Sequence, residues 1–177
     1  MEVPDSIRAQ LAPYLENWSR RATDFRWVPA ANLHLTLKFL GNSEESRLQE
    51  LASSLRGLPF PPFELAFGST GSFGTSRRAR VVWLELARGA SELVALASTV
   101  EQAASMLGWE PEMRSFRPHL TLARARDRRG STPPAVESLP ELGSWTAQEV
   151  TIYQSRLRPG APEYLPLHTI PLAGSLN

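Results

Sequence analysis

Apolar residues recur along the chain with two spacings, one typical of helices and the other typical of strands. Spacings of three and four residues predict helices that begin at Asp5 as N-cap, after Asn42 with Glu45 in a capping box, and at Ser91. Pro13 lies inside the first helix and is expected to kink or restart it. Alternating and continuous apolar runs predict strands at 25–28, 33–40, 63–67, 80–86, 145–154 and 164–172, with a short strand at 109–113.

Glycine, proline and serine mark the connections between these elements. Gly57 and Gly108 are expected to end the second and third helices, because glycine readily adopts the left-handed conformation found at helix C-termini. The predicted connections are a loop or hairpin tip at 68–76, a surface loop at 127–140 with a helical turn at 135–138, and a hairpin loop at 156–164. Helices and strands joined by hairpins predict an α+β fold with antiparallel sheets.

The tetrapeptide His-Leu-Thr-Leu occurs twice, at His34–Leu37 and at His119–Leu122, and its copies contain two of the three histidines in the chain. Side chains alternate between the faces of a strand, so each histidine shares a face with the threonine two residues later. A single copy would indicate only an ordinary half-buried strand. Two copies about half a chain apart predict two similar halves, each contributing an imidazole and a hydroxyl to one cleft.

Length and composition limit the classes of protein that fit. The 177 residues suit one compact domain or two small lobes sharing a core. The absence of cysteine excludes disulfides, thiolate catalysis and thiolate metal sites. The sequence shows neither a signal peptide nor an apolar run long enough to cross a bilayer. We therefore expect a cytoplasmic monomer that does not associate with membranes.

Arginines are concentrated in two places, although the formal net charge is only +1. One cluster is Arg77, Arg78 and Arg80, and the other is Arg124, Arg126, Arg128 and Arg129, directly after the second tetrapeptide. Most basic runs are solvated loops, but an arginine can donate two hydrogen bonds to one phosphate, and Arg124 is expected to do so. Because Arg124 lies an odd number of residues from His119, the strand must bend, bulge or end before it.

Two histidines facing one cleft suit in-line displacement at phosphorus. A neutral imidazole takes a proton from the attacking water while an imidazolium protonates the departing oxygen. Thr36 and Thr121 can donate to the non-bridging oxygens. A metal site is the competing interpretation, but hydrolytic zinc needs three protein ligands, and no carboxylate lies beside either motif histidine, so we expect no metal or other cofactor. His168, alone in its segment, is expected to be structural.

The paired tetrapeptides resemble the two His-x-Thr motifs of the two-histidine (2H) phosphoesterase superfamily. Within it, the chain resembles RNA 2',3'-cyclic phosphodiesterases, also called 2'-5' RNA ligases, at 26–29, 32–41 and 116–124, with weaker matches at 73–74, 153–155, 160 and 164. This resemblance implies two pseudo-symmetric α+β lobes whose antiparallel sheets line a central cleft, with helices outside. It also implies metal-independent opening of a terminal 2',3'-cyclic phosphate to a 2'-phosphomonoester.

The resemblance implies roles for five residues. His34 and His119 are the catalytic pair, with His34 as the acid and His119 as the base, and Thr36, Thr121 and Arg124 bind the phosphate. The implied partners are RNA 3' ends bearing a 2',3'-cyclic phosphate, with tRNA fragments and cyclic nucleotides as further candidates. Two alternatives stay open: reversible 2'-5' RNA ligation by the same site, and a non-catalytic module that binds RNA ends.

The chain departs from the family at its N-terminus. Members of the family usually begin with an apolar strand before the proline that leads into the first helix, whereas this chain begins Met1-Glu2-Val3-Pro4. Residues 1–177 are therefore expected to form a single bilobal domain without that opening strand. Its absence is expected to leave an unpaired slot or edge beside the cleft.

Overall fold

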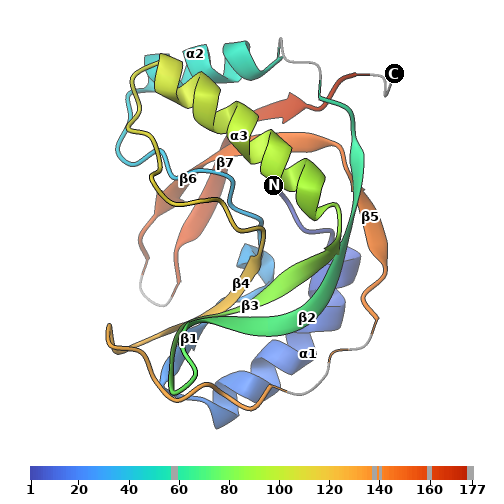
Figure 1. Cartoon of the computed structure of the whole chain (residues 1–177), viewed down its shortest axis with the longest axis vertical. Coiled ribbons are helices and arrows are strands. Elements are labelled where there is room, and N and C mark those ends of the chain that lie inside the picture. Colours follow the sequence, from blue (N-terminus) through green and yellow to red (C-terminus); the bar gives the residue numbers. More distant parts are fainter. Residues whose placement is uncertain (57–59, 137–138, 140, 159–160, 175–177) are drawn as a thin grey trace.

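Helices surround two antiparallel sheets in the computed structural model, which describes residues 1–56, 60–136, 139, 141–158 and 161–174 (Figure 1). The elements, in chain order, are α1 Asp5–Arg21, β1 Phe25–Trp27, the 3-10 helix η1 Ala30–Asn32, α2 Glu45–Arg56, β2 Phe63–Thr75, β3 Arg78–Arg88, α3 Ala90–Met106, β4 Leu120–Ala125, β5 Ser144–Ala147, β6 Glu149–Arg156 and β7 Glu163–Pro171. This mixture of helices and antiparallel strands confirms the predicted α+β class.

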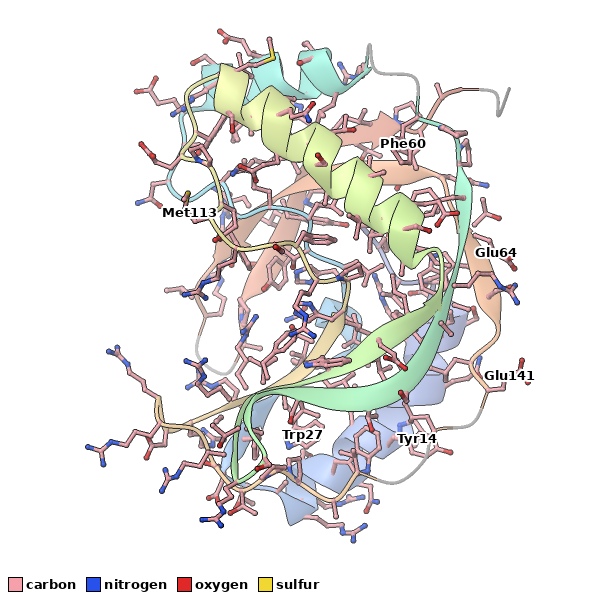
Figure 2. The ribbon with its side chains drawn as sticks, viewed as in Figure 1. Tyr14, Trp27, Phe60, Glu64, Met113 and Glu141 are labelled. Carbon is pink, nitrogen blue, oxygen red and sulfur yellow. The ribbon has the colours of Figure 1, made fainter. Side chains whose placement is uncertain are left out.

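The sheets divide the molecule into two lobes. The larger sheet has the strand order β1-β4-β3-β2-β5, and the smaller sheet consists of β6 and β7. Helix α1 covers one face of the larger sheet, on the side where Tyr14 and Trp27 lie (Figure 2). The ring centroids of Trp18 on α1 and Trp27 on β1 are 5.6 Å apart. Helices α2 and α3 lie at the opposite end of the molecule, and α2 packs on β7 (Figure 1).

One continuous hydrophobic core joins the two lobes. Its fully buried members come from both halves of the chain and include Leu11, Leu33, Leu51, Leu84 and Leu122. Removing one such side chain from water contributes about 1.5–3 kcal/mol, so the core is the main source of stability. None of the helices among the described residues is both long enough and apolar enough to cross a membrane.

All three predicted helices are present, but their first residues differ from the prediction. Pro4 is the N-cap of α1 and no side chain caps this helix, so the predicted cap by Asp5 is wrong. The helix continues through Pro13 without a restart. Helix α2 begins at Glu45, later than a cap at Asn42 requires, and Gly89 rather than Ser91 is the N-cap of α3.

Of the two glycines predicted to end helices, only Gly108 lies among the described residues. Gly108 has a φ of +86° and its N–H donates to the Ser105 carbonyl at 2.9 Å, so it ends α3 as predicted. Gly57 lies outside the described residues.

The predictions for two segments differ from the structure. The segment 33–40, predicted as a strand, forms only isolated bridges, at His34 and Leu35. The glycine- and serine-rich segment 68–76, predicted as a loop or hairpin tip, belongs to the β2–β3 hairpin, but it continues β2 to Thr75 and only 76–77 turn. Gly71 is required in this strand because a Cβ there would lie 2.3 Å from the ring of Trp83 on β3.

The second half of the chain also differs from the prediction. The strand predicted at 145–154 is interrupted at Gln148, so that β5 joins the larger sheet and β6 joins the smaller one. No strand forms at 109–113. Within 135–138, Ala135 and Val136 are not helical and the other two residues lie outside the described part of the chain. The last strand and the β6–β7 hairpin are confirmed.

Candidate functional site

The two His-Leu-Thr-Leu segments lie side by side, although they are far apart in sequence. Leu35 and Leu120 form an antiparallel bridge, and both side chains are buried in the core. An antiparallel bridge at this pair sets His34 across from Thr121, and Thr36 across from His119. Since neighbouring residues alternate between faces, these four polar side chains share the face opposite the leucines.

Backbone pairing holds each motif on both of its edges. On one side, β4 pairs with β3 along Leu120–Arg124. On the other side, β4 pairs with β1 and then with Leu35. The first motif is paired in turn with the N-terminus: Glu2 bridges His34, and the Leu35 N–H donates to the Met1 carbonyl at 2.9 Å. The motifs therefore sit inside a paired array.

Both imidazoles are oriented in the same way. The Nδ1 atom of His34 lies 2.8 Å from the Asn32 carbonyl oxygen, and Nδ1 of His119 lies 2.6 Å from the Arg117 carbonyl oxygen. A carbonyl oxygen only accepts hydrogen bonds, so Nδ1 carries the hydrogen in both rings. Nε2 is thus the atom of each ring that is available to exchange a proton.

An aromatic ring packs against each motif histidine. The His34 ring makes an edge contact with Tyr164 of β7, with centroids 4.7 Å apart, and the His119 ring makes one with Phe73 of β2, at 4.9 Å. The Trp83 ring is 5.1 Å from Phe73 and 6.5 Å from His119. These contacts restrict rotation of both imidazoles.

Burial and nearby arginines make both histidines weaker bases than usual. Desolvation is the largest cause that lowers the pKa of His34 and of His119 below the ordinary value of 6.5, while the backbone hydrogen bond at Nδ1 acts in the opposite direction. The positive charge of Arg124 also lowers the pKa of both rings, and Arg117 further lowers that of His119. The same positive field attracts anions.

A bulge in β4 explains how Arg124, an odd number of residues from His119, lies on the same face of the strand as His119. In the β3–β4 pairing, Val82 is opposite Ala123 but Trp83 is opposite Thr121, so Leu122 has no partner of its own. Leu122 and Ala123 are consecutively buried, and Arg124 is exposed. The bulge shifts the alternation by one residue, which turns Arg124 to the face that carries Thr121.

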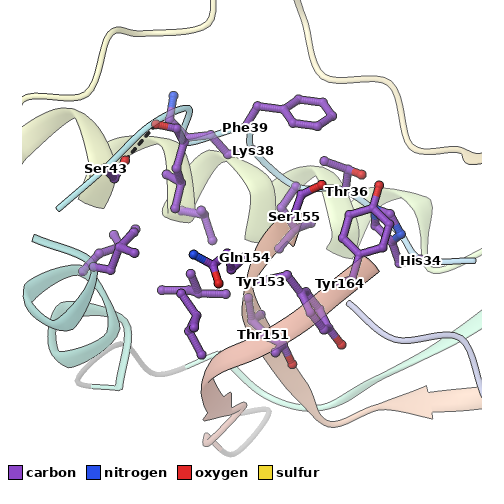
Figure 3. A pocket seen from close by; sticks show the side chains of 18 of the residues that line it. His34, Thr36, Lys38, Phe39, Ser43, Thr151, Tyr153, Gln154, Ser155 and Tyr164 are labelled. Atoms are coloured by element: carbon purple, nitrogen blue, oxygen red, sulfur yellow. Dashed lines mark hydrogen bonds between the residues drawn. The ribbon is translucent and has the colours of Figure 1, made fainter. Parts of the chain in front are cut away.

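A cavity of about 610 Å³ adjoins the first motif. His34, Thr36 and Tyr164 lie at one end of it, and Gln154 lies towards its middle (Figure 3). None of the four residues of the second motif lines this cavity. The cavity therefore adjoins the first motif and not the second.

Among the described residues, no three histidine or carboxylate side chains come together as potential metal ligands. His168 lies on β7, with its Nε2 3.4 Å from a carboxylate oxygen of Glu45, and it belongs to the contact between β7 and α2. The buried Nε2 of His168 makes no hydrogen bond within the part of the chain that the structure describes, so the structural role expected for this residue stays a prediction.

Two contributors to the site carry no local sequence signal. The carbonyl groups that orient the imidazoles belong to Asn32 and Arg117, and any residue supplies a carbonyl. Arg8 of α1 lowers the pKa of His34, yet it lies in a helix remote in sequence. The two carbonyl groups lie two residues before their histidines, so the local backbone supplies them, whereas only the tertiary fold brings Arg8 to His34.

Comparisons with known proteins agree with this geometry. The sequence model of the LigT-like phosphoesterase family matches residues 1–83 and again residues 84–163, so each match contains one tetrapeptide. The RNA 2',3'-cyclic phosphodiesterase of Escherichia coli is 34% identical, over 94% of this chain and 90% of its own length. That of Aeropyrum pernix is 30% identical, over 94% of this chain and 97% of its own length.

Solved structures share the fold of this chain. The crystal structure of E. coli LigT complexed with 3'-AMP has a TM-score of 0.77 at 30% identity and covers 97% of this chain and 94% of its own. The crystal structure of TT0787 of Thermus thermophilus has a TM-score of 0.79 at 27% identity and covers 98% of this chain and 96% of its own. Sequence and structure together show that this chain belongs to the LigT-like phosphoesterase family.

Proposed function

We propose that the protein hydrolyses the 2',3'-cyclic phosphate at the 3' end of RNA to a 2'-phosphomonoester, without a metal. The observation that carries the proposal is the Leu35–Leu120 bridge, which brings the two His-x-Thr motifs together in opposite directions. The named relatives of similar length support the same substrate class. We further propose that residues 1–177 act as one bilobal domain, as a monomer in the cytoplasm.

The reaction requires that the attacking water lose a proton and that the departing oxygen gain one. Nε2 of the neutral histidine, assigned to His119, takes a proton from water, and the water oxygen bonds to phosphorus. The bond between phosphorus and O3' breaks, and Nε2 of the charged histidine, assigned to His34, protonates O3'. The products are a 2'-phosphate and a free 3'-hydroxyl. Thr36, Thr121 and Arg124 stabilise the charge on the non-bridging oxygens.

Chelation is expected to leave turnover unchanged. An oligonucleotide ending in 2',3'-cyclic phosphate, incubated with the protein in EDTA, should be converted to the 2'-monoester, because protein side chains supply both proton transfers. Product is measured by chromatography against 2'- and 3'-monoester standards. Loss of conversion in EDTA would indicate a metal enzyme, and tight binding without conversion would indicate an RNA-end-binding module. Adding an RNA with a free 5'-hydroxyl to the same assay tests for 2'-5' joining.

The pH dependence of kcat/KM is expected to be bell-shaped, with its maximum on the acid side of the ordinary histidine pKa. Activity rises as the base histidine loses its proton and falls as the acid histidine loses its own, and both pKa values are lowered. The Arg124→Gln variant lacks a positive charge that lowers the pKa of both histidines. Both pKa values should therefore rise, and the rising and falling limbs of the pH profile should both move to higher pH. Rate profiles of the two proteins measure this shift.

The exposed Arg20 of α1 provides the matched control, since it pairs with Glu16 on the helix that covers the other face of the sheet. Arg20→Gln should leave both limbs in place. A wild-type profile that is flat from about pH 5 to 9, or limbs that do not move in Arg124→Gln, would count against the assigned pair.

A further inference from the structure

Arg26 of β1 lies directly opposite Arg124 of β4 on the same face of the larger sheet. The register of the two strands pairs Arg26 with Arg124. The neighbours of Arg26 point to α1: Phe25 is buried in the core, and Trp27 donates from Nε1 to the Ala22 carbonyl oxygen at 3.1 Å. Since side chains alternate, Arg26 points to the face that carries Arg124 and Thr121.

No ion pair among the described residues offsets the charge of Arg26 or of Arg124. Arg8, Arg20 and Arg88, by contrast, each pair with a carboxylate. Like charges directly opposite each other on a sheet destabilise it. Such a pair becomes favourable when an anion lies between or beside the guanidinium groups.

Arg26 lies beyond the phosphate site formed by the two motifs. Along β4, Arg124 follows Thr121 by three residues, and the bulge leaves two register steps between them, which corresponds to roughly 7 Å at a rise of about 3.3 Å per residue. The positive charge of Arg124 lowers the pKa of both imidazoles, whereas Arg26 is not among the charges that lower the pKa of either one. An arginine side chain at this separation reaches an anion next to the reacting phosphate.

More positively charged side chains lie beyond Arg26, near the β2–β3 hairpin and the loop that follows β4. The bridge between Ala79 and Ser131 brings the β2–β3 hairpin against the loop that follows β4, and Arg78 donates to the Gly130 carbonyl at 3.2 Å. Nitrogen-tipped side chains project from this end of the molecule (Figure 2). A polyanionic strand leaving the site past Arg26 would therefore meet more cations.

We infer that Arg26 binds the phosphodiester immediately 5' of the terminal nucleotide, and so selects RNA ends over free cyclic mononucleotides. The inference rests on the proposed function. It follows from the pairing of Arg26 with Arg124, because a nucleic acid strand held at its terminal phosphate by the motifs places its next phosphate within reach of the outer arginine. A cyclic mononucleotide has no such phosphate and gains nothing from Arg26.

The test compares three substrates: 2',3'-cyclic AMP, an adenylyl dinucleotide ending in 2',3'-cyclic phosphate, and the same dinucleotide with a neutral methylphosphonate linkage. In Arg26→Ala, the ratio of kcat/KM for the dinucleotide to that for cyclic AMP should fall on the order of tenfold, as expected for losing one charge-assisted contact. For the wild-type protein, kcat/KM should be lower by a similar factor on the methylphosphonate dinucleotide than on the phosphodiester dinucleotide. On the methylphosphonate dinucleotide, Arg26→Ala should have the same kcat/KM as the wild type.

A salt titration gives an independent readout. For an oligonucleotide, the slope of log kcat/KM against log salt should be smaller by about 0.7 in Arg26→Ala, the value for one contact to a single strand. Arg20→Ala, which removes an exposed arginine on α1, should change neither the ratio nor the slope. The thermal midpoint should stay near the wild-type value because Arg26 is exposed.

The outcomes separate the inference from the proposed function. A wild-type protein that opens none of the three substrates would overturn the proposed function itself. Turnover of the substrates with an unchanged ratio in Arg26→Ala would overturn only the inference. If Arg26→Ala lowered kcat/KM by the same factor on the phosphodiester dinucleotide and on the methylphosphonate dinucleotide, the inference would also be overturned. Arg26 would then act on something other than the charge of that phosphate.

Discussion

Replacing His34 or His119 by alanine is expected to lower kcat for opening of a 2',3'-cyclic phosphate by a factor on the order of 10² to 10⁴. Each ring presents Nε2 for proton transfer because its Nδ1 is bound to a backbone carbonyl. One reaction uses both rings, so the double variant should be little worse than the more damaged single variant. Single-turnover rates on a fluorescent oligonucleotide measure all three proteins.

His168 is the matched control for these substitutions. Its imidazole contacts Glu45 between β7 and α2, away from the motifs, so His168→Gln should retain turnover close to that of the wild type. Circular dichroism and thermal unfolding show whether each variant is folded. If either motif variant, folded, kept turnover within tenfold of the wild type, that histidine would not be a proton-transfer group.

Replacing Lys38 by methionine is expected to reduce the free energy of unfolding by about 2–4 kcal/mol. The Lys38 side chain is only 5% exposed, and its Nζ lies 2.7 and 2.8 Å from the carboxylate oxygens of Glu101 and 3.1 Å from the Glu110 carbonyl oxygen. Methionine fills a similar volume but leaves a partly buried carboxylate without its cation. Urea unfolding, followed by tryptophan fluorescence, measures the loss.

Two comparisons sharpen the Lys38 experiment. Adding Glu101→Gln to Lys38→Met should restore part of the stability, because no charge is then left unpaired. Breaking the exposed Arg20–Glu16 pair by Arg20→Met should cost no more than about 0.5 kcal/mol. A loss in Lys38→Met as small as that in Arg20→Met would show that Lys38 does not anchor the first motif to α3.

The pH dependence of this stability has a defined sign. Burial raises the pKa of Glu101, but hydrogen bonds from Lys38 and from the Glu112 N–H outweigh burial, so the net pKa is below its usual value. The folded-state pKa is depressed, so the stabilisation is present above the ordinary carboxyl pKa and is lost as pH falls through the depressed one. The difference between wild type and Lys38→Met should therefore narrow in acid.

The elements with local sequence signals were predicted well. Helical spacing identified α1, α2 and α3, because burial of one face follows directly from periodicity. Alternation also assigned the faces of the first motif, where Leu33 and Leu35 are buried and His34 and Thr36 are only partly buried. The catalytic and phosphate-binding roles of the motif residues stay predictions, since they depend on chemistry rather than on placement.

The errors arose where distant strands decide the local structure. Segment 68–76 was predicted as a loop or hairpin tip because it is rich in glycine, but most of it is strand, and Gly71 is needed under the ring of Trp83 on the neighbouring strand. Segment 33–40 has the composition of a strand, yet it forms β-bridges only at His34 and Leu35. The bulge at Leu122 depends on the register with β3, which no residue within β4 specifies.

The pairing of Leu35 with Leu120 has a consequence for biosynthesis. A translating ribosome delivers the N-terminal half first, and this half cannot complete the bridge until residue 120 has emerged. Contacts of such high sequence separation form late, since the intervening chain must be ordered before they contribute. A nascent or truncated chain should therefore be inert towards RNA, and competence should arrive in a single step with the closing of the long loop between the two halves.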